Sequence, residues 1–336
     1  MGRLFGISLP PGEKIGEAWL VADLPVASSW VTNGPGGEQL LSDVRQAWGE
    51  RLIGAAWKSR RARSDFPLLV KFIDAHDDLS VQVHPGGKAP GAGGGALGDR
   101  LPGHPGKDTS SVSKDESWII LDGEPGARIL HGFRENTTLR DFDRLLAADR
   151  VAECLRSVAV RPGDVFRVAP GVVHALCRGV MVLEIQEPSD TTFRIYDYGR
   201  LGDNGKPRPL HIDEARKVMR FGEVAPAPTI PSVSRHEWGC HEILVDVPAY
   251  RIERVRMKGT LSWDVDPVST QVVVVVEGEV GLHAEAARLD LKKGDCVILP
   301  AAVGAVRLDA GDMQTCCVVA GAGGIPLVST RHRDGR

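Results

Sequence analysis

Short β-branched runs separated by glycine and proline are the feature that most limits what this chain can fold into. The 336 residues include 39 glycines and 22 prolines, and few long helical periods lie between them. Many short strands bounded by turn residues are typical of a sandwich or barrel, so we expect a mainly β protein. Helical patterns occur at about 38–54, 137–157 and 212–220, and Thr138 with Asp141 predicts the N-cap of the second.

A weak internal repeat predicts two related β-modules. Residues 161–170 read as a Pro-Gly-Asp turn, an apolar strand and a proline, and residues 293–300 follow the same order. Four residues beyond the first proline stands His174, whereas Gly304 occupies that place after the second. We therefore expect only the first module to have kept a residue that can bind a metal.

The composition places a domain boundary near 225–235, where EVAPAPTIPSVS is rich in proline and small residues. We expect an N-terminal metal-binding domain over 1–225 and a C-terminal domain without metal ligands over 236–330. Residues 86–113 form a glycine-rich stretch with no apolar period, which predicts a mobile surface loop. Its glycines do not match a phosphate-binding loop, because no GK[ST] ending leads into a helix.

Charge and cysteine content narrow the class of partner. The formal net charge of −3 and pI near 6.4 provide no basic field for nucleic acid or an anionic membrane, which leaves a small molecule. The N-terminus has no apolar segment typical of a signal peptide, so we expect a soluble, cytoplasmic protein. Six cysteines without CxxC spacing predict neither a disulfide framework nor a thiolate metal site.

The run from Phe66 to His84 ends in an alternation of polar and apolar residues. In a strand, the period of two puts Gln82 and His84 on one face and the valines on the other. An amide oxygen and an imidazole on one face suit two ligands of one ion. Taken alone, the pattern is more typical of a half-buried strand with a wet outer face, so a second set of ligands elsewhere in the chain must decide.

Two further residues extend this donor set. Glu116 opens the apolar strand ESWIIL, and His174 follows a turn in PGVVHAL. Any one of these residues alone is more often structural, but two imidazoles, a carboxylate and an amide oxygen together suit Zn²⁺. Two histidines and one carboxylate would also suit non-haem Fe(II).

Cations nearby in the sequence favour an anionic substrate. Arg194 lies in a strand after the SDTT turn, where it either faces the pocket or lies on the surface. Lys71 is flanked by apolar residues, so it either snorkels or points into a functional cavity. Lys114 stands two residues before Glu116.

These residues lie in blocks that resemble one known family. The blocks are FPLLVKFIDAHDDLSVQVHP, KDESWIIL, RPGDVFRVAPGVVHALCRG, VLEIQEPSDTTFRIYDYGR and GKPRPLHI, together with the N-terminal GEAW and NGP. In order and spacing they are similar to the short bacterial form of type I phosphomannose isomerase. The resemblance covers nearly the whole chain.

The resemblance implies a cupin-type β-sandwich (jelly roll) pair with a few helices, one Zn²⁺ per chain, and interconversion of mannose 6-phosphate and fructose 6-phosphate. Carried over by position, the metal ligands would be Gln82, His84, Glu116 and His174. The same resemblance assigns a catalytic role to Arg194 and places Lys71 and Lys114 in the pocket.

The chain departs from the family pattern at two places. After His84-Pro85 the family usually has two acidic residues and a tyrosine, whereas this chain continues Gly86-Gly87-Lys88 into the glycine-rich stretch. Asp115 stands where the family commonly has a small or neutral residue. Both changes affect the expected rim of the pocket rather than the ligands.

An aldose to ketose conversion through a cis-enediol needs a base and a group that holds oxyanion charge. The metal and Arg194 could hold the charge, and the base could be Lys114, if its surroundings favour the neutral amine, or a hydroxide on the metal. Lys71 or Lys114 could instead anchor the phosphate. Two other functions fit the same residues: an Fe(II) oxygenase and a non-catalytic sugar-binding module.

Overall fold

The computed structural model describes residues 1–5, 15–35, 37–55, 66–86, 113–202, 204–222, 228–285 and 287–329. Apart from its first and last residues, the glycine-rich stretch 86–113 lies outside the described residues. The described chain divides into two compact units. We call Ile73–Pro228 the central unit, and Met1–Phe72 with Thr229–Arg336 the terminal unit.

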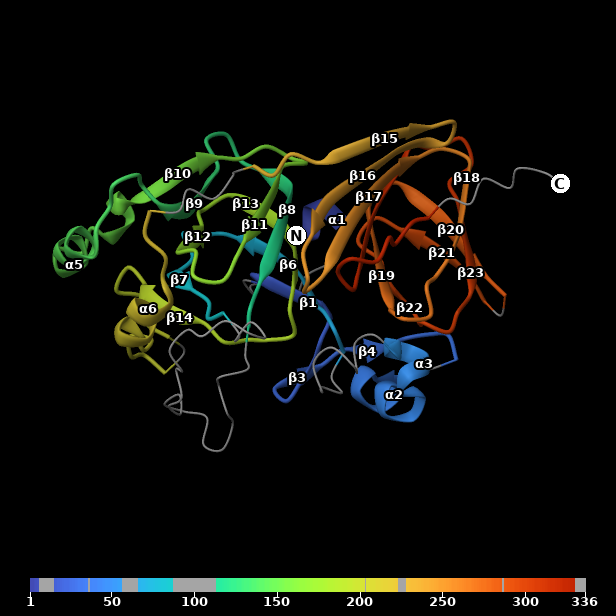
Figure 1. The fold of residues 1–336 in the computed structure, drawn as a ribbon, viewed down its shortest axis with the longest axis horizontal. Helices are drawn as coiled ribbons and strands as arrows, with labels where there is room; N and C mark the ends of the chain where they lie inside the picture. The colour runs from blue at the N-terminus through green and yellow to red at the C-terminus, as the bar shows by residue number, and fades with distance from the viewer. Residues whose placement is uncertain are drawn as a thin grey trace. The chain divides into compact units, whose positions relative to one another are not determined.

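The central unit is a sandwich of two antiparallel sheets (Figure 1). The first sheet includes, in spatial order, β6 (Leu69–Ala75, in which the unit boundary falls), β13 (Val180–Gln186), β8 (Glu116–Gly123) and β11 (Val165–Val168). The second consists, in order, of β10 (Leu155–Ala159), β9 (Arg128–Phe133), β12 (His174–Leu176), β7 (Val81–Val83) and β14 (Phe193–Tyr196).

Apolar side chains fill both sides of the second sheet. Between the sheets pack Trp118, Phe166 and Ile129, among others. On the outer side, Val81 and Val83 pack with residues of α5 (Leu139–Ala147) and α6 (Ile212–Val218). Because successive strand residues face opposite sides, this packing leaves Gln82 on the interior face.

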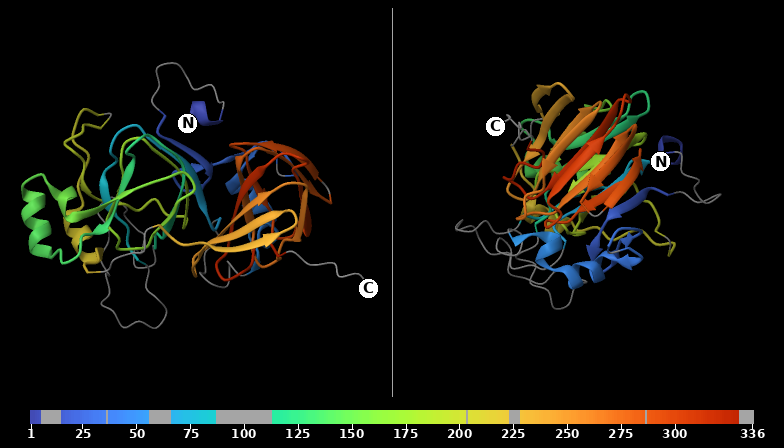
Figure 2. Two further views of the ribbon diagram at one scale, coloured as in Figure 1. Left: turned by 90° about the horizontal axis from the view of Figure 1, so that it is seen from above. Right: turned by 90° about the vertical axis from the view of Figure 1, so that its right-hand side faces the viewer.

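The terminal unit contains a second sandwich. Its larger sheet runs in the order β15 (Ser232–His236), β16 (Gly239–Asp246), β17 (Arg251–Met257), β24 (Thr315–Gly321), β19 (Gln271–Glu277) and β22 (Cys296–Leu299). The smaller sheet runs β18 (Thr260–Asp264), β23 (Ala305–Asp309), β20 (Glu279–Ala284) and β21 (Ala287–Lys292). The antiparallel strands β15, β16 and β17 run side by side in both views of Figure 2.

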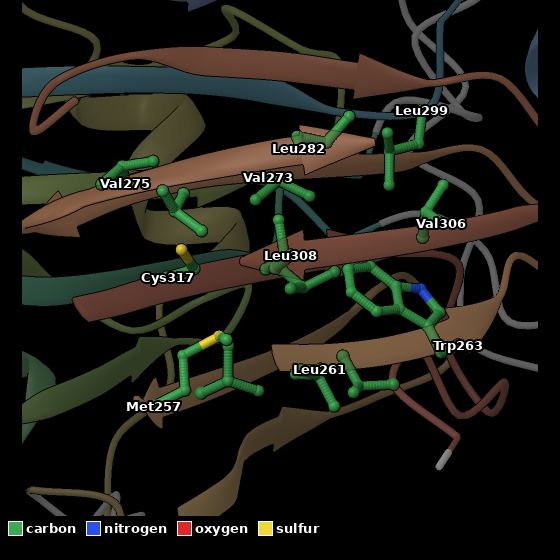
Figure 3. Close-up of a cluster of buried hydrophobic side chains, with 14 of the residues drawn as sticks. Met257, Leu261, Trp263, Val273, Val275, Leu282, Leu299, Val306, Leu308 and Cys317 are labelled. Carbon is green, nitrogen blue, oxygen red and sulfur yellow. The ribbon is translucent and has the colours of Figure 1, made fainter. Parts of the chain in front are cut away.

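The interior of this second sandwich is apolar. Trp263, Leu261 and Leu308 of the smaller sheet face Val273 and Val275 of the larger one (Figure 3). Each of these side chains is almost completely buried. The predicted cupin-type pair of β-sandwiches is confirmed.

The N-terminal segment supplies short elements to the terminal unit. They are α1 (Gly2–Phe5), β1 (Glu17–Val21), β2 (Asp23–Leu24), β3 (Ala27–Ser28), β4 (Trp30–Val31), β5 (Gln39–Leu40), α2 (Leu41–Trp48) and α3 (Glu50–Ile53). The last three carbonyls of α3 accept hydrogen bonds from the backbone N–H groups of Ala302, Ala301 and Thr270, at 3.0, 3.0 and 3.3 Å. These bonds join α3 to the C-terminal sandwich, with which residues 1–72 form one compact unit. This division differs from the expected ranges 1–225 and 236–330.

The helical patterns appear as shorter elements than the sequence indicated. The pattern at 38–54 is interrupted at Gly49, whose φ of 52° separates α2 from α3. The capping box of Thr138 and Asp141 is present at the start of α5. The end of the 137–157 pattern is a 3₁₀ turn (Val151–Cys154) followed by β10, which pairs with β9 from Leu155 onward. In the described part of the chain, no helix is long and apolar enough to cross a membrane.

A candidate metal centre

Strand register places Gln82 and His174 on one sheet of the central sandwich and Glu116 on the facing sheet. On the second sheet Gln82 pairs with His174, and His174 pairs with His131. On the first sheet Glu116 pairs with Gln186. Directly paired residues share a face, so residues distant in sequence lie side by side in each row.

The three ionisable candidates meet in the interior. Glu116 Oε2 lies 3.2 Å from His84 Nε2, and Glu116 Oε1 lies 3.3 Å from His174 Nε2. One ligand atom from each residue lies within 4.8 Å of the others. All three side chains are buried, with at most 1% of their surface exposed.

Backbone carbonyls fix the orientation of both imidazoles. His84 Nδ1 lies 3.0 Å from Thr191 O, and His174 Nδ1 lies 2.8 Å from Val172 O. A carbonyl can only accept, so each Nδ1 carries the proton and each Nε2 presents a lone pair toward Glu116. Histidine ligands of metals are usually held in this way.

Burial keeps the two histidines neutral. It lowers the pKa of His174 to about 3, against the opposing effect of Glu116. Burial and then the charge of Lys114 lower the pKa of His84. Neutral imidazole is the form that binds a metal.

Glu116 remains ionised despite its burial. Burial opposes ionisation, but the surrounding groups, and the positive charge of Lys114 above all, outweigh it and hold the pKa of Glu116 well below its usual value. Among the described residues, neither of its oxygens has a hydrogen-bond partner of good geometry. The buried carboxylate and the two imidazole lone pairs that face it together form a donor set that suits a divalent metal.

Gln82 lies beside this group. Its amide nitrogen is 3.3 Å from His174 Nε2, and its oxygen accepts a hydrogen bond from Ser80 Oγ at 3.2 Å. The oxygen would face the imidazole only after a half turn of the terminal amide. Gln82 therefore lies within reach as a fourth ligand.

The predicted cations lie in different surroundings. Lys114 Nζ is 3.0 Å from Glu116 Oε2 and 3.2 Å from His84 Nε2. Arg194 pairs with Gln82 across β14 and β7, and its guanidinium donates to Pro209 O at 3.1 Å. Burial, and then the positive charge of Arg208, lower the pKa of Arg194. Lys71 belongs to the terminal unit, where its Nζ lies 4.3 Å from the centre of the Trp19 ring.

Several contacts around the centre were not anticipated from the sequence. Asp115 is turned toward Arg167, with oxygens 3.1 and 2.6 Å from the guanidinium nitrogens. His131 Nε2 lies 3.0 Å from Arg167 O, which ties the two sheets together. Trp118 packs edge-on to His174 and donates to Glu184. These partners are far apart in sequence, and no local pattern connects them.

Comparison with known proteins finds relatives that match most of the chain. Residues 1–93 match the model of the type I phosphomannose isomerase catalytic domain. The mannose-6-phosphate isomerase of Streptococcus mutans is 31% identical over 314 residues, covering 92% of this chain and 90% of that protein. A probable mannose-6-phosphate isomerase of Bacillus subtilis is 36% identical over 243 residues, covering 72% and 69%.

Solved structures show the same fold. The crystal structure of mannose 6-phosphate isomerase from Bacillus subtilis superimposes with a TM-score of 0.79 at 28% identity, covering 95% of this chain and 93% of that one. A mannose 6-phosphate isomerase bound with zinc and yttrium has a TM-score of 0.71 at 20% identity, which shows a common fold. The resemblance noted in the sequence is confirmed: the chain belongs to the mannose-6-phosphate isomerase family.

Proposed function

We propose that this protein interconverts mannose 6-phosphate and fructose 6-phosphate with one Zn²⁺ per chain. The observation that carries the proposal is the meeting of His84, Glu116 and His174, the last two at 3.3 Å, inside a sandwich of this family's fold. The activity is that named for the relatives. The buried histidine and carboxylate donors support Zn²⁺ as the metal.

The ligands in this proposal are Gln82, His84, Glu116 and His174. Glu116 contributes the only negative charge among these four, and the carbonyls of Thr191 and Val172 hold the two imidazoles in the required tautomer. When bound, the metal ion would supply Lewis-acid stabilisation of negative charge on the substrate oxygens.

The remaining chemistry falls to the cations of the chain. The reaction moves a proton between C2 and C1, so a base must take that proton while positive groups hold the enediol charge. Arg194, on the same row as Gln82, would stabilise this charge. Lys114 lies beside the ligand atoms, where its amine could move the proton or its ammonium could hold the substrate.

Lys71 is proposed as a substrate-binding residue and not as a metal ligand. It would bind substrate, as its position in the FPLLVK block implies. Its ammonium also lies 3.5 Å from Glu17 Oε2, so a substitution at Lys71 would test both substrate binding and this ion pair.

A coupled assay on mannose 6-phosphate, before and after removal of metal by a chelator, tests the proposal. We expect turnover that is lost on chelation and restored by Zn²⁺. Arg194→Ala should reduce kcat by orders of magnitude and leave the bound zinc in place. Full activity after chelation, or iron in place of zinc in the native protein, would contradict the proposal.

A further inference from the structure

The loop that follows β13, residues 187–191, contacts both sides of the metal centre. On one side it is joined to Asp115, the residue between Lys114 and Glu116. The backbone N–H of Glu187 donates to Asp115 O at 3.0 Å, and the N–H of Asp115 donates to Glu187 Oε2 at 3.0 Å. Both backbone groups of Asp115 are therefore held by one loop residue.

On the other side the same loop holds an imidazole. Thr191 O accepts the Nδ1 proton of His84 at 3.0 Å. A shift of this carbonyl would rotate the ring and move its Nε2 lone pair away from Glu116. The 187–191 loop thus fixes donors that come from two different segments of the chain.

Gln186 holds the loop in shape from inside. Its side chain is completely buried, and its Nε2 donates to Glu187 O at 3.0 Å and to Ser189 O at 2.6 Å. The opposite orientation of the amide would place its oxygen against two carbonyl oxygens, so the orientation is fixed. Ser189 Oγ adds a second internal contact, accepting from the N–H of Thr191 at 3.2 Å.

Gln186 also lies beside the centre itself. It pairs directly with Glu116 across β13 and β8, so the two side chains share the interior face. Its donors are nevertheless both used by the loop, and among the described residues its Oε1 has no hydrogen-bond partner. The amide of Gln186 therefore acts through the loop.

We infer that Gln186 is a positioning residue of the metal centre. Its two N–H bonds lock the 187–191 loop, and the loop in turn orients His84 and the segment that carries Glu116. The inference rests on the proposed metal-dependent function. Groups that orient metal ligands in this way typically change metal affinity by about 10- to 100-fold when removed.

A purely structural role predicts a different result, and the terminal unit offers a matched control. Gln271 is also a buried glutamine at one end of a central strand, and its Nε2 donates to Leu327 O at 2.9 Å. Gln186→Met and Gln271→Met remove the same amide and keep similar side-chain volume. Both should lower stability, but only the first should affect the metal.

The experiment measures the Zn²⁺ dissociation constant of each metal-free protein by competition with a chromogenic chelator, together with its urea unfolding midpoint. We expect Gln186→Met to weaken zinc binding by about 10- to 100-fold, and Gln271→Met to stay within about twofold of the original protein. Ser189→Ala, which removes the second internal contact, should weaken zinc binding in the same direction by a smaller factor.

The outcomes separate the two proposals. If the original protein takes up no zinc, the metal-dependent function fails. If it binds zinc and both Gln186→Met and Ser189→Ala bind equally well, only the inference about the loop is overturned. Should Gln186→Met not fold, the zinc affinity of Ser189→Ala decides the question.

Discussion

The two sandwiches of this chain share one topology and differ in what fills them. In the central unit the strands run β6-β13-β8-β11 in one sheet, and in the terminal unit β17-β24-β19-β22 take the same places. The facing sheets likewise share the orders β10-β9-β12-β7 and β21-β20-β23-β18. The first interior contains the cluster of His84, Glu116 and His174, whereas the second is mainly apolar.

Two matching turns put the strands in register. Gly163 N–H donates to Ile120 O at 2.8 Å, and Gly294 N–H donates to Val275 O at 2.8 Å. The two glycines have φ values of 94° and 97°, where a side chain would be strained. Ile120 and Val275 are therefore equivalent positions of β8 and β19.

Four residues before these positions the sandwiches diverge. Glu116 stands in β8, and Gln271 stands in β19. Gln271 is satisfied internally, because its Oε1 accepts from Trp263 Nε1 at 3.0 Å and its Nε2 donates to Leu327 O. At the start of the next matching strand, His174 of β12 corresponds to Ala305 of β23, because the preceding turns match through the bonds from Val172 N–H to Ala169 O and from Val303 N–H to Pro300 O. The sequence repeat had aligned His174 with Gly304, one residue too early. A few residue differences at equivalent positions thus distinguish the candidate metal centre from a mainly apolar core.

Exchanging the equivalent residues Glu116 and Gln271 should have the largest effect, and the property affected is zinc binding. Glu116→Gln gives the central sandwich the residue found in the other one, and removes the negative charge from the ligands. We expect zinc affinity to fall by at least about 100-fold and turnover to be lost. Equilibrium dialysis with metal analysis measures the loss. Gln271→Glu is the reciprocal variant and should gain no zinc, because Ala305 stands where the central sandwich has His174.

A cavity in the interior of the terminal sandwich should lower the stability of the protein and leave its zinc affinity unchanged. Trp263 is 3% exposed and packs in the terminal core. Trp263→Ala should destabilise the protein by about 3–5 kcal/mol, since it leaves a cavity and removes the partner of Gln271. Urea unfolding measures this cost. A marked loss of zinc affinity in the same variant would contradict the separation of roles between the sandwiches.

The terminal unit should also contain a carboxylate, Glu253, whose contribution to stability is lost at low pH. Burial opposes ionisation of Glu253, but its bonds to His241, Arg251 and the backbone of Leu327 and Val328 lower its pKa to about 2. The unfolded chain, with a pKa near 4.5, binds this proton first as the pH falls. The stabilisation is therefore complete above about pH 5 and is lost as the pH falls toward 2.

The pH effect can be isolated by a difference measurement. The lowering of the Glu253 pKa from 4.5 to about 2 corresponds to roughly 3 kcal/mol of free energy of unfolding. The stability difference between the original protein and Glu253→Gln should shrink between about pH 5 and pH 2. A difference that stays constant over this range would mean that the carboxylate does not anchor the C-terminal segment through its charge.

The smallest expected effects concern the matching turns. Asp164 Oδ2 accepts from Arg161 N–H at 2.8 Å, and Asp295 Oδ2 accepts from Lys292 N–H at 2.9 Å. Asp164→Ala and Asp295→Ala should each cost about 1 kcal/mol, the value of one such hydrogen bond. Unequal costs in urea unfolding would argue against the equivalence of the two turns.

Local patterns in the sequence were sufficient for much of the fold. The glycine and proline spacing indicated short strands, and Thr138 with Asp141 indicated the start of α5, because both signals depend on neighbouring residues. The repeat of Pro-Gly-Asp and Lys-Gly-Asp turns anticipated the paired architecture. The end of α5 was not predicted, because the residues from Leu155 onward form a strand that depends on pairing with β9, and no local pattern shows that pairing.

The residue pattern indicated the candidate site only through residue types that can bind a metal. The alternation at Gln82 depends on a period of two, which is visible locally. Gln186 and the pair Asp115 and Arg167 were missed because their partners are set by strand register and loop path. The same limit applies to residues 1–72, whose grouping with the terminal unit depends on hydrogen bonds to residues more than 200 positions away.

Anomalous diffraction at the zinc edge, from crystals grown with Zn²⁺, tests the central claim most directly. The account predicts one strong peak per chain, within bonding distance of His84 Nε2, Glu116 and His174 Nε2, and no peak inside the terminal sandwich. A peak bound by other residues, or no peak between these three side chains, would contradict it.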